Sequence, residues 1–311
     1  MPELFYGWLP DYPDFRDRSI DHTKPTDNYK DNLTEEKSIK HLRSKAKEKE
    51  FEELGDKKAK LPSKTSEDLT KYFHPVDMQG DFNTCTAHAA TALIEYFESR
   101  TYGDSEKKSR LFLYKVTRNL LGMKDDSGAF LRTTMKSLVL FGVPPENYWM
   151  YEKRNINKEP TPFCYSYAQN YQAVQYYRLD KPDNKIINNN QDLLREVKIN
   201  LLKGLPLMFG FTVYSNIHKA KENGGLIAYP SLRNSQLAGH AVVAIGYDDN
   251  IKIQGEEDEF SIGAIRIRNS WGEEWGEKGY GWLPYTYILK GLTRDWWSII
   301  KTEWINSKAF D

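Results

Sequence analysis

Two kinds of apolar pattern follow one another along the chain after residue 60. Apolar residues recur at helical spacing in segments 84–103, 130–143 and 191–204, and the last two segments close on Gly142 and Gly204. Strand-like runs, bounded by Gly, Asn and Asp, then occupy residues 205–214, 239–249, 263–271 and 279–289. Helices first and strands later predict an α+β protein with two segregated halves.

The first predicted helix carries a cysteine at its start. Its apolar face consists of Ala87, Ala90, Leu93, Ile94 and Phe97, and Cys85 follows the loop-like sequence GDFNT. A thiol attacks well only as the thiolate, and unpaired N–H groups at a helix amino terminus favour that anion. Cys85 is therefore a candidate nucleophile, although a lone cysteine on an apolar face is more often a small buried hydrophobe.

The first sixty residues differ from the rest of the chain. Residues 1–33 are rich in Pro, Asp and Tyr and predict extended chain with turns, whereas residues 35–60 carry many charges of both signs. A thin apolar stripe near helical spacing runs from Ile39 to Leu54, and Gly55 is a plausible end. Two interpretations stay open, a solvated helix or linker and a helix that lies over a cleft and regulates it.

Composition narrows the class of protein. Lys+Arg and Asp+Glu number 44 each, so the net charge gives no argument for a nucleic-acid or membrane partner. The opening residues lack the basic start and unbroken apolar stretch of a signal peptide, and no apolar run approaches about 18 residues. Two cysteines, Cys85 and Cys164, make no disulfide framework. We expect a soluble protein of a reducing compartment, cytoplasmic or exported without an amino-terminal signal.

Three further residues are suited to work with Cys85. Gln79, six positions earlier, could donate its amide to an oxyanion, with Gly80 letting the chain turn between them. His240 stands at the start of an apolar strand, where Ala238 and Gly239 leave space around it. Each of these two is weak evidence when taken alone, and a structural histidine is an equal alternative.

The third residue, Asn269, ends an alternating strand. Its amide oxygen could accept from one imidazole N–H and so fix the tautomer of His240. Trp271 and Trp275 follow among several glycines, in an aromatic turn that could shield such a contact from water or simply pack as a hairpin.

These segments together resemble the papain family of cysteine peptidases. Three segments match the active-site segments of that family in order. They are Gln79–Gly80 before Cys85, GHAVVAIGYD around His240, and RNSWGEEWGEKGYGW from Arg268. The separation from Cys85 to His240 (240 − 85 = 155 residues) is also similar. The segment that begins at Leu61, LPSKTSEDLTKYFHPVDMQG, resembles the start of a mature enzyme of this family. The opening segment YGWLPDYPDFRD resembles the non-secreted, bacterial-type branch of the family.

The resemblance implies a papain-like α+β fold with two lobes and a cleft between them. It implies a helical lobe at about 61–165 that carries the nucleophile, and an antiparallel, β-barrel-like lobe at about 166–311 that carries His240 and Asn269. Residues 1–60 would be an amino-terminal extension, either an inhibitory pro-segment or a permanent part of the chain.

Roles are implied residue by residue. Cys85 attacks the scissile carbonyl, its N–H and the Gln79 side chain form the oxyanion hole, and His240 exchanges the proton. Asn269 orients His240, and Trp271 covers that contact. Substrate binding is assigned to Ser127, Gly128, Gly239 and Trp271, with substrate docking as an added strand at the Ser127–Gly128 edge.

The sequence departs from the family pattern close to the nucleophile. Phe82 replaces a cysteine that is often disulfide-bonded, and Asn83 stands where glycine is usual, a position that we expect Asn to tolerate through a positive φ. Thr86 and His88 also differ, and His88 either lines the core or modifies the site. Cys164 is expected to be a buried filler.

The expected function is a cysteine peptidase that acts on peptides or proteins through a thioester acyl-enzyme. A silent peptide-binding module on the same scaffold and a papain-fold acyltransferase or amidase remain alternatives. No cofactor is implied, and no cluster of residues has metal-ligand spacing. Substrate preference and oligomeric state do not follow from the sequence.

Overall fold

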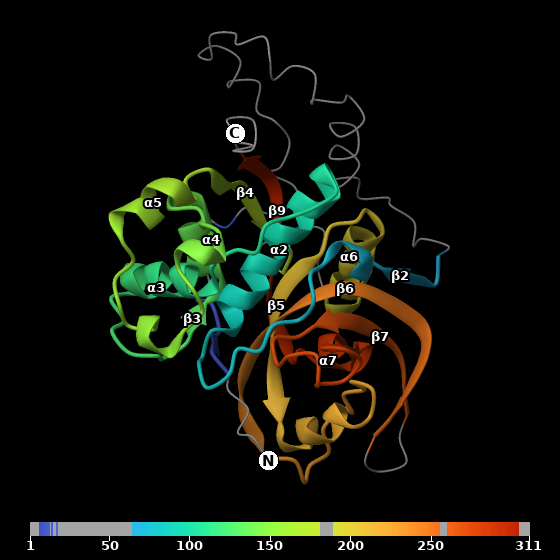
Figure 1. The fold of residues 1–311 in the computed structure, drawn as a ribbon. Coiled ribbons are helices and arrows are strands. Elements are labelled where there is room, and N and C mark those ends of the chain that lie inside the picture. The colour runs from blue at the N-terminus through green and yellow to red at the C-terminus, as the bar shows by residue number, and fades with distance from the viewer. Residues whose placement is uncertain are drawn as a thin grey trace.

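The computed structural model describes residues 6–12, 14, 17, 64–180, 189–255 and 260–304. The predicted charged helix within residues 35–60 and the boundary at Leu61 lie outside these residues. Figure 1 shows helices α3, α4 and α5 on one side of the molecule, strands β5, β6 and β7 on the other, and α2 between them. The α+β prediction is confirmed.

Among the residues that the structure describes, four α-helices form the helical side. They are α2 (Cys85–Tyr102), α3 (Arg110–Leu121), α4 (Leu131–Leu140) and α5 (Pro162–Ala168). Glycine in the left-handed conformation ends α2 at Gly103 and α3 at Gly122. Short 3₁₀ turns occupy Thr70–Tyr72, Glu146–Tyr148, Lys153–Asn155 and, on the sheet side, Ser215–Lys221.

The sheet side is a seven-stranded antiparallel sheet in the order β4-β9-β5-β6-β7-β8, with β2 paired to β6. Its strands are β2 (Ser66–Asp68), β4 (Tyr171–Arg178), β5 (Leu207–Tyr214), β6 (Gln236–Gln254), β7 (Phe260–Arg268), β8 (Tyr280–Pro284) and β9 (Thr293–Trp304). Helices α6 (Asn190–Leu202) and α7 (Tyr285–Leu289) pack on this sheet. A second, two-stranded sheet pairs β1 (Trp8–Leu9) with β3 (Ala129–Phe130) in parallel.

Local patterns located α2, α4, α6 and the strands β5 to β8 and missed the other elements. The predicted strand 279–289 is wrong beyond Pro284, because proline fixes φ there at −63° and residues 285–289 turn into α7. The patterns do not predict α3, α5, β4 or β9. The apolar residues of β9 are not in strict alternation, since Trp296 and Trp297 are both fully buried, one stacked on Phe209 at 3.9 Å.

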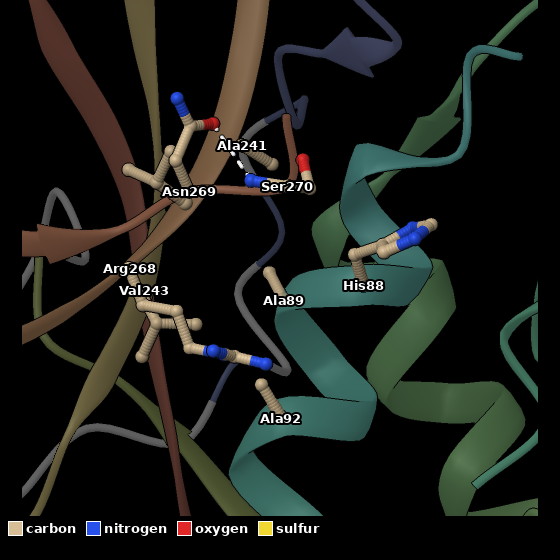
Figure 2. A pocket seen from close by; sticks show the side chains of 9 residues that line it. His88, Ala89, Ala92, Ala241, Val243, Arg268, Asn269 and Ser270 are labelled. Atoms are coloured by element: carbon tan, nitrogen blue, oxygen red, sulfur yellow. Dashed lines mark hydrogen bonds between the residues drawn. The ribbon is translucent and has the colours of Figure 1, made fainter. Parts of the chain in front are cut away.

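Small residues bring α2, the helix that begins at Cys85, close to the sheet. Ala89 and Ala92 of α2 face Val243 of β6 and Arg268 of β7, and Figure 2 shows them on either side of a small pocket. Because alanine side chains are short, α2 packs directly against β6. This packing places the first residue of the helix beside Ala241 of β6.

Candidate active site

Cys85 and His240 come from opposite sides of the molecule and meet at its centre. Cys85 is the first residue of α2 and His240 lies in β6, and both side chains are fully buried. The N–H of Ala241, the residue after the histidine, donates to Cys85 Sγ at 3.4 Å. The structure therefore brings these two predicted residues together.

Asn269 fixes the state of the imidazole. His240 Nε2 and Asn269 Oδ1 are 2.8 Å apart, and Oδ1 also accepts from the Ser270 N–H at 2.8 Å. Since an amide oxygen only accepts, Nε2 carries the ring proton of the neutral imidazole. Nδ1 is buried without a hydrogen-bond partner and is left as the basic nitrogen.

Trp271 lies on the histidine ring. The two ring planes are nearly parallel, at 20°, with centroids 4.5 Å apart, and Trp271 is itself buried against Trp275. The indole therefore excludes water from one face of the imidazole. This is the position that the sequence predicts for Trp271.

Gln79 is tied both to the asparagine segment and to the loop before the nucleophile. Its Oε1 accepts from Ser270 Oγ at 2.6 Å, and its Nε2 donates to the Phe82 carbonyl at 2.7 Å. The Gln79 N–H also donates to the Ser270 carbonyl at 2.8 Å. Ser270 was missed by sequence reasoning, and its only signal was its place between Asn269 and Trp271.

A carboxylate clamps the loop that precedes Cys85. The N–H of Asn83 lies 3.1 Å from both Oδ1 and Oδ2 of Asp126, and Asn83 Nδ2 donates to the Asp126 carbonyl at 2.8 Å. Tyr114 Oη donates to the same carboxylate at 2.5 Å. Asn83 does not adopt the positive φ that the sequence suggested, so this loop is held by Asp126 instead.

His88 belongs to the support of the site. Its Nδ1 lies 3.1 Å from the Thr84 carbonyl, and its ring packs edge-on against Tyr151, which also packs against Phe82. Burial lowers the pKa of His88 to about 3, so the ring is neutral and lines the core. Cys164 is free and buried in α5, as expected of a filler residue.

Residues 6–9, which we call the N-terminal strap, cross the site between the two sides of the molecule. The Gly7 carbonyl accepts from the Ala129 N–H at 2.7 Å, and the Gly7 N–H donates to the Gly239 carbonyl at 3.4 Å. Tyr6 meets His240 and Trp271 edge-on, with ring centroids 6.0 Å away in each case.

Glycine is required where the strap passes the loop that precedes Cys85. A Cβ on Gly7 would lie 2.0 Å from the Asn83 carbonyl oxygen, and one on Gly128 would lie 2.4 Å from the Gly7 oxygen. Gly128 and Gly239, both predicted to bind substrate, therefore contact the strap. Ser127 is exposed and turns its Oγ to Met123 Sδ and the Asp125 carbonyl, and the backbone hydrogen bond to the strap comes from Ala129, the residue after Gly128.

Burial decides the charge of the two central residues. Burial raises the pKa of the Cys85 thiol to about 12, although hydrogen bonds from the backbone N–H groups of Ala241 and Thr86 oppose it. Burial also lowers the pKa of His240 to about 4, against the effect of Asn269. The sequence predicts a lowered thiol pKa from the helix amino terminus, but in the covered site desolvation is larger, and both groups are neutral.

Within the part of the chain that the structure describes, no group of His, Cys, Asp and Glu residues could hold a metal ion. None of the described helices has the length and apolar character needed to cross a membrane.

Replacing Asp126 with alanine tests the clamp. Asp126→Ala removes the acceptor of the Asn83 N–H and of Tyr114, so we expect the free energy of unfolding to fall by about 1–3 kcal/mol. Denaturant unfolding measures this. The matched control is Asp125→Ala, which removes the neighbouring exposed carboxylate. Equal unfolding midpoints for the two variants would contradict the clamp.

Displacing the strap should make the thiol more acidic. Trp8→Ala removes the buried tryptophan of the strap, which should displace the strap and let water reach Cys85. The pKa of the Cys85 thiol should then fall from about 12 towards the ordinary value. Alkylation of Cys85 by iodoacetamide, followed against pH and assigned by peptide mapping, should then be faster at pH 7–8 than in wild type. Tyr12→Ala, which alters an exposed ring, is the control. Superimposable pH profiles for wild type and Trp8→Ala would refute burial by the strap as the cause.

Comparison with known proteins agrees with this geometry. Residues 62–288 match the family described as papain family cysteine protease. A curated relative, the uncharacterized peptidase C1-like protein L477 of Acanthamoeba polyphaga mimivirus, is 31% identical over 225 residues, which cover 71% of this chain and 68% of that protein.

Solved structures give the same result. Xylellain, a cysteine protease from Xylella fastidiosa, is 32% identical with a TM-score of 0.68, covering 97% of this chain and 96% of its own. The protease and lectin-like domains of Cwp84 from Clostridium difficile share the fold, with a TM-score of 0.62 and 19% identity over 79% of this chain and 54% of that one. The papain-like fold is thereby confirmed, and the chain belongs to the papain family of cysteine proteases and is a cysteine-type peptidase.

Proposed function

We propose that Cys85, His240 and Asn269 are the catalytic triad of this peptidase, and that it cleaves peptide bonds through a thioester acyl-enzyme. The observation that carries the proposal is the hydrogen bond from His240 Nε2 to Asn269 Oδ1, which leaves Nδ1 as the base on the strand that contacts Cys85 Sγ. The substrates would be peptides or proteins.

In the proposed reaction, His240 Nδ1 takes the proton of the Cys85 thiol and the sulfur attacks the scissile carbonyl. The oxyanion would be held by the N–H of Cys85, at the start of α2, and by the Gln79 amide. His240 then gives its proton to the leaving amine nitrogen as the C–N bond breaks. Water attacks the resulting thioester, its proton passes through His240 back to sulfur, and the acid product is released.

Asn269 is proposed to orient the imidazole rather than to touch the substrate. Without it, the ring could rotate and present the protonated nitrogen to the thiol. Ser270 supports the same arrangement, because it donates to Asn269 through its N–H and to Gln79 through its Oγ.

We also propose that the strap inhibits the enzyme by occupying the cleft. It uses the backbone groups of Ala129 and Gly239 that a docked peptide strand would need, and it covers His240 with Tyr6. The Gly7 carbonyl accepts a hydrogen bond from the Ala129 N–H. The Gly7 carbonyl is therefore not held by the proposed oxyanion donors, which are the Cys85 N–H and the Gln79 amide. Opening of the strap would therefore precede both substrate binding and formation of the charged thiolate–imidazolium pair.

The triad is tested by peptide-library hydrolysis under reducing conditions. Cys85→Ala should reduce cleavage to background, and Asn269→Ala should lower kcat by at least about 100-fold, the usual contribution of a positioned base. Cys164→Ala is the matched control because it removes the other buried cysteine, and it should retain activity. Cleavage by Cys85→Ala at the wild-type rate would refute the triad, and failure of a thiol-reactive epoxide to label Cys85 in any variant would favour a binding module.

Inhibition by the strap is tested in the full chain by Gly7→Ala. The added Cβ would overlap the Asn83 carbonyl, so the strap should leave the cleft. We expect kcat/KM for peptide cleavage to rise at least about tenfold, which corresponds to about 1.4 kcal/mol of strap binding. Tyr12→Ala should behave as wild type. Equal activity of Gly7→Ala and wild type, with unchanged thermal unfolding, would show that the strap does not inhibit.

A further inference from the structure

The side chain of Trp8 fills a pocket whose floor consists of two glycines. A Cβ on Gly210 of β5 would lie 2.0 Å from Trp8 Cε2, and a Cβ on Gly239 of β6 would lie 2.5 Å from Trp8 Cε3. The two strands are hydrogen-bonded neighbours, with Gly210 opposite Ala241 and Gly239 opposite Thr212. Glycine weakens the interior of a strand, so two glycines under one indole indicate a site shaped for a large flat side chain.

The far end of the pocket carries a buried acceptor. Trp8 Nε1 donates to Asp295 Oδ2 at 3.1 Å, and Asp295 is 1% exposed. The other carboxylate oxygen, Oδ1, accepts from Arg178 Nη2 at 2.7 Å. Asp295 has a positive φ of 60°, and its N–H donates to Asp180 at 2.8 Å, so its position is set by its own surroundings and not by the strap.

Both donors to Asp295 Oδ2 come from the amino-terminal segment. They are Trp8 Nε1 and the Asp11 N–H, the latter at 2.8 Å. When the segment leaves, this buried oxygen loses both. A buried acceptor without a donor is costly, so whatever enters the pocket next is selected for a donor at the same place.

Charge at the end of the pocket favours a neutral donor. The cluster there contains Arg132 and Arg178 with Asp11, Asp17, Asp180 and Asp295. Removal of the segment takes away Asp11 and Asp17, which leaves two arginines and two aspartates, for a sum of zero (+2 − 2). A cationic side chain would then add an uncompensated charge close to Arg178.

The pocket lies beside the proposed catalytic groups. Gly239 directly precedes His240 and accepts from the Gly7 N–H, so the strap residue next to Trp8 passes the histidine. We propose that this is a substrate side-chain pocket, which the strap fills with its own tryptophan, and that it selects tryptophan over phenylalanine and over arginine. This inference rests on the proposed function, since it names the substrate class of the same cleft.

The test uses the full-length Trp8→Ala variant, in which the pocket is vacated. Each fluorogenic peptide carries one varied residue, placed at one of the three positions on either side of the cleaved bond. Mass spectrometry of the products locates the bond that is cleaved. The varied residues are Trp, Phe, Arg, Ala and benzothienylalanine, a ring isostere of tryptophan with sulfur in place of the N–H. Burial raises the pKa of Asp295 to about 7, so the assay is run at pH 8, where the carboxylate predominates.

At one position we expect kcat/KM for the Trp peptide to exceed that for the Phe, Arg and benzothienylalanine peptides by at least about tenfold. Adding Asp295→Ala should bring the ratio of Trp to benzothienylalanine close to one. Adding Gly210→Val, which places carbons where the indole lies, should lower the ratio of Trp to Ala. Cleavage with no preference for Trp at any position, or a preference that survives both substitutions, would overturn the pocket assignment.

A binding arm separates this inference from the proposed chemistry. In full-length Cys85→Ala/Trp8→Ala, fluorescence anisotropy of labelled peptides should show Trp binding at least about tenfold more tightly than benzothienylalanine. Binding with this preference but no cleavage by any variant would support the pocket and refute the peptidase mechanism. Cleavage with equal binding of the two peptides would support the mechanism and refute the pocket. Because Asp295→Ala could fail to fold, Gly210→Val provides the same decision independently.

Discussion

The hydrogen bond between His240 Nε2 and Asn269 Oδ1 is the contact on which the rest of the site depends. A neutral imidazole has one N–H, and this contact uses it, so Nδ1 is necessarily the basic nitrogen. Asn269 Oδ1 is in turn fixed by the Ser270 N–H, and Trp271 keeps water from the ring. The tautomer and the surroundings of His240 are thus set by neighbouring side chains of the protein itself.

The same dry surroundings oppose the charges that a thiolate–imidazolium pair would carry. With the strap in place, burial raises the pKa of Cys85 and lowers that of His240, so both are neutral. The helix amino terminus and the Asn269 contact act in the opposite direction, but they are smaller than the cost of desolvation. In the proposed inhibited state, one segment would therefore both cover the proposed triad and keep Cys85 and His240 neutral. The buried Trp8 indole of that segment donates to Asp295.

The loop that precedes Cys85 is held by hydrogen bonds and not by a covalent link. Both cysteines are free, and the loop is tied to Asp126 at Asn83 and to Gln79 at Phe82. Gln79 continues the connection to Ser270 across the cleft. Contacts to a carboxylate are among the stronger hydrogen bonds, which explains how an ordinary loop keeps the start of α2 in place in a chain without disulfides.

The order of residues was sufficient to predict the helix that begins at Cys85, the strands around His240 and Asn269, and the family to which the chain belongs. These features are local, because periodicity and short motifs depend on neighbours within a few turns or strands. Pairings such as Asn83 with Asp126, Gln79 with Ser270, and Trp8 with Asp295 join residues 43, 191 and 287 positions apart. Such distances follow from the packing of the whole chain, and so does the burial that sets the charge of the thiol. The covered, neutral state of the site and the pocket under Trp8 became visible only when the fold placed the strap between the two halves of the molecule.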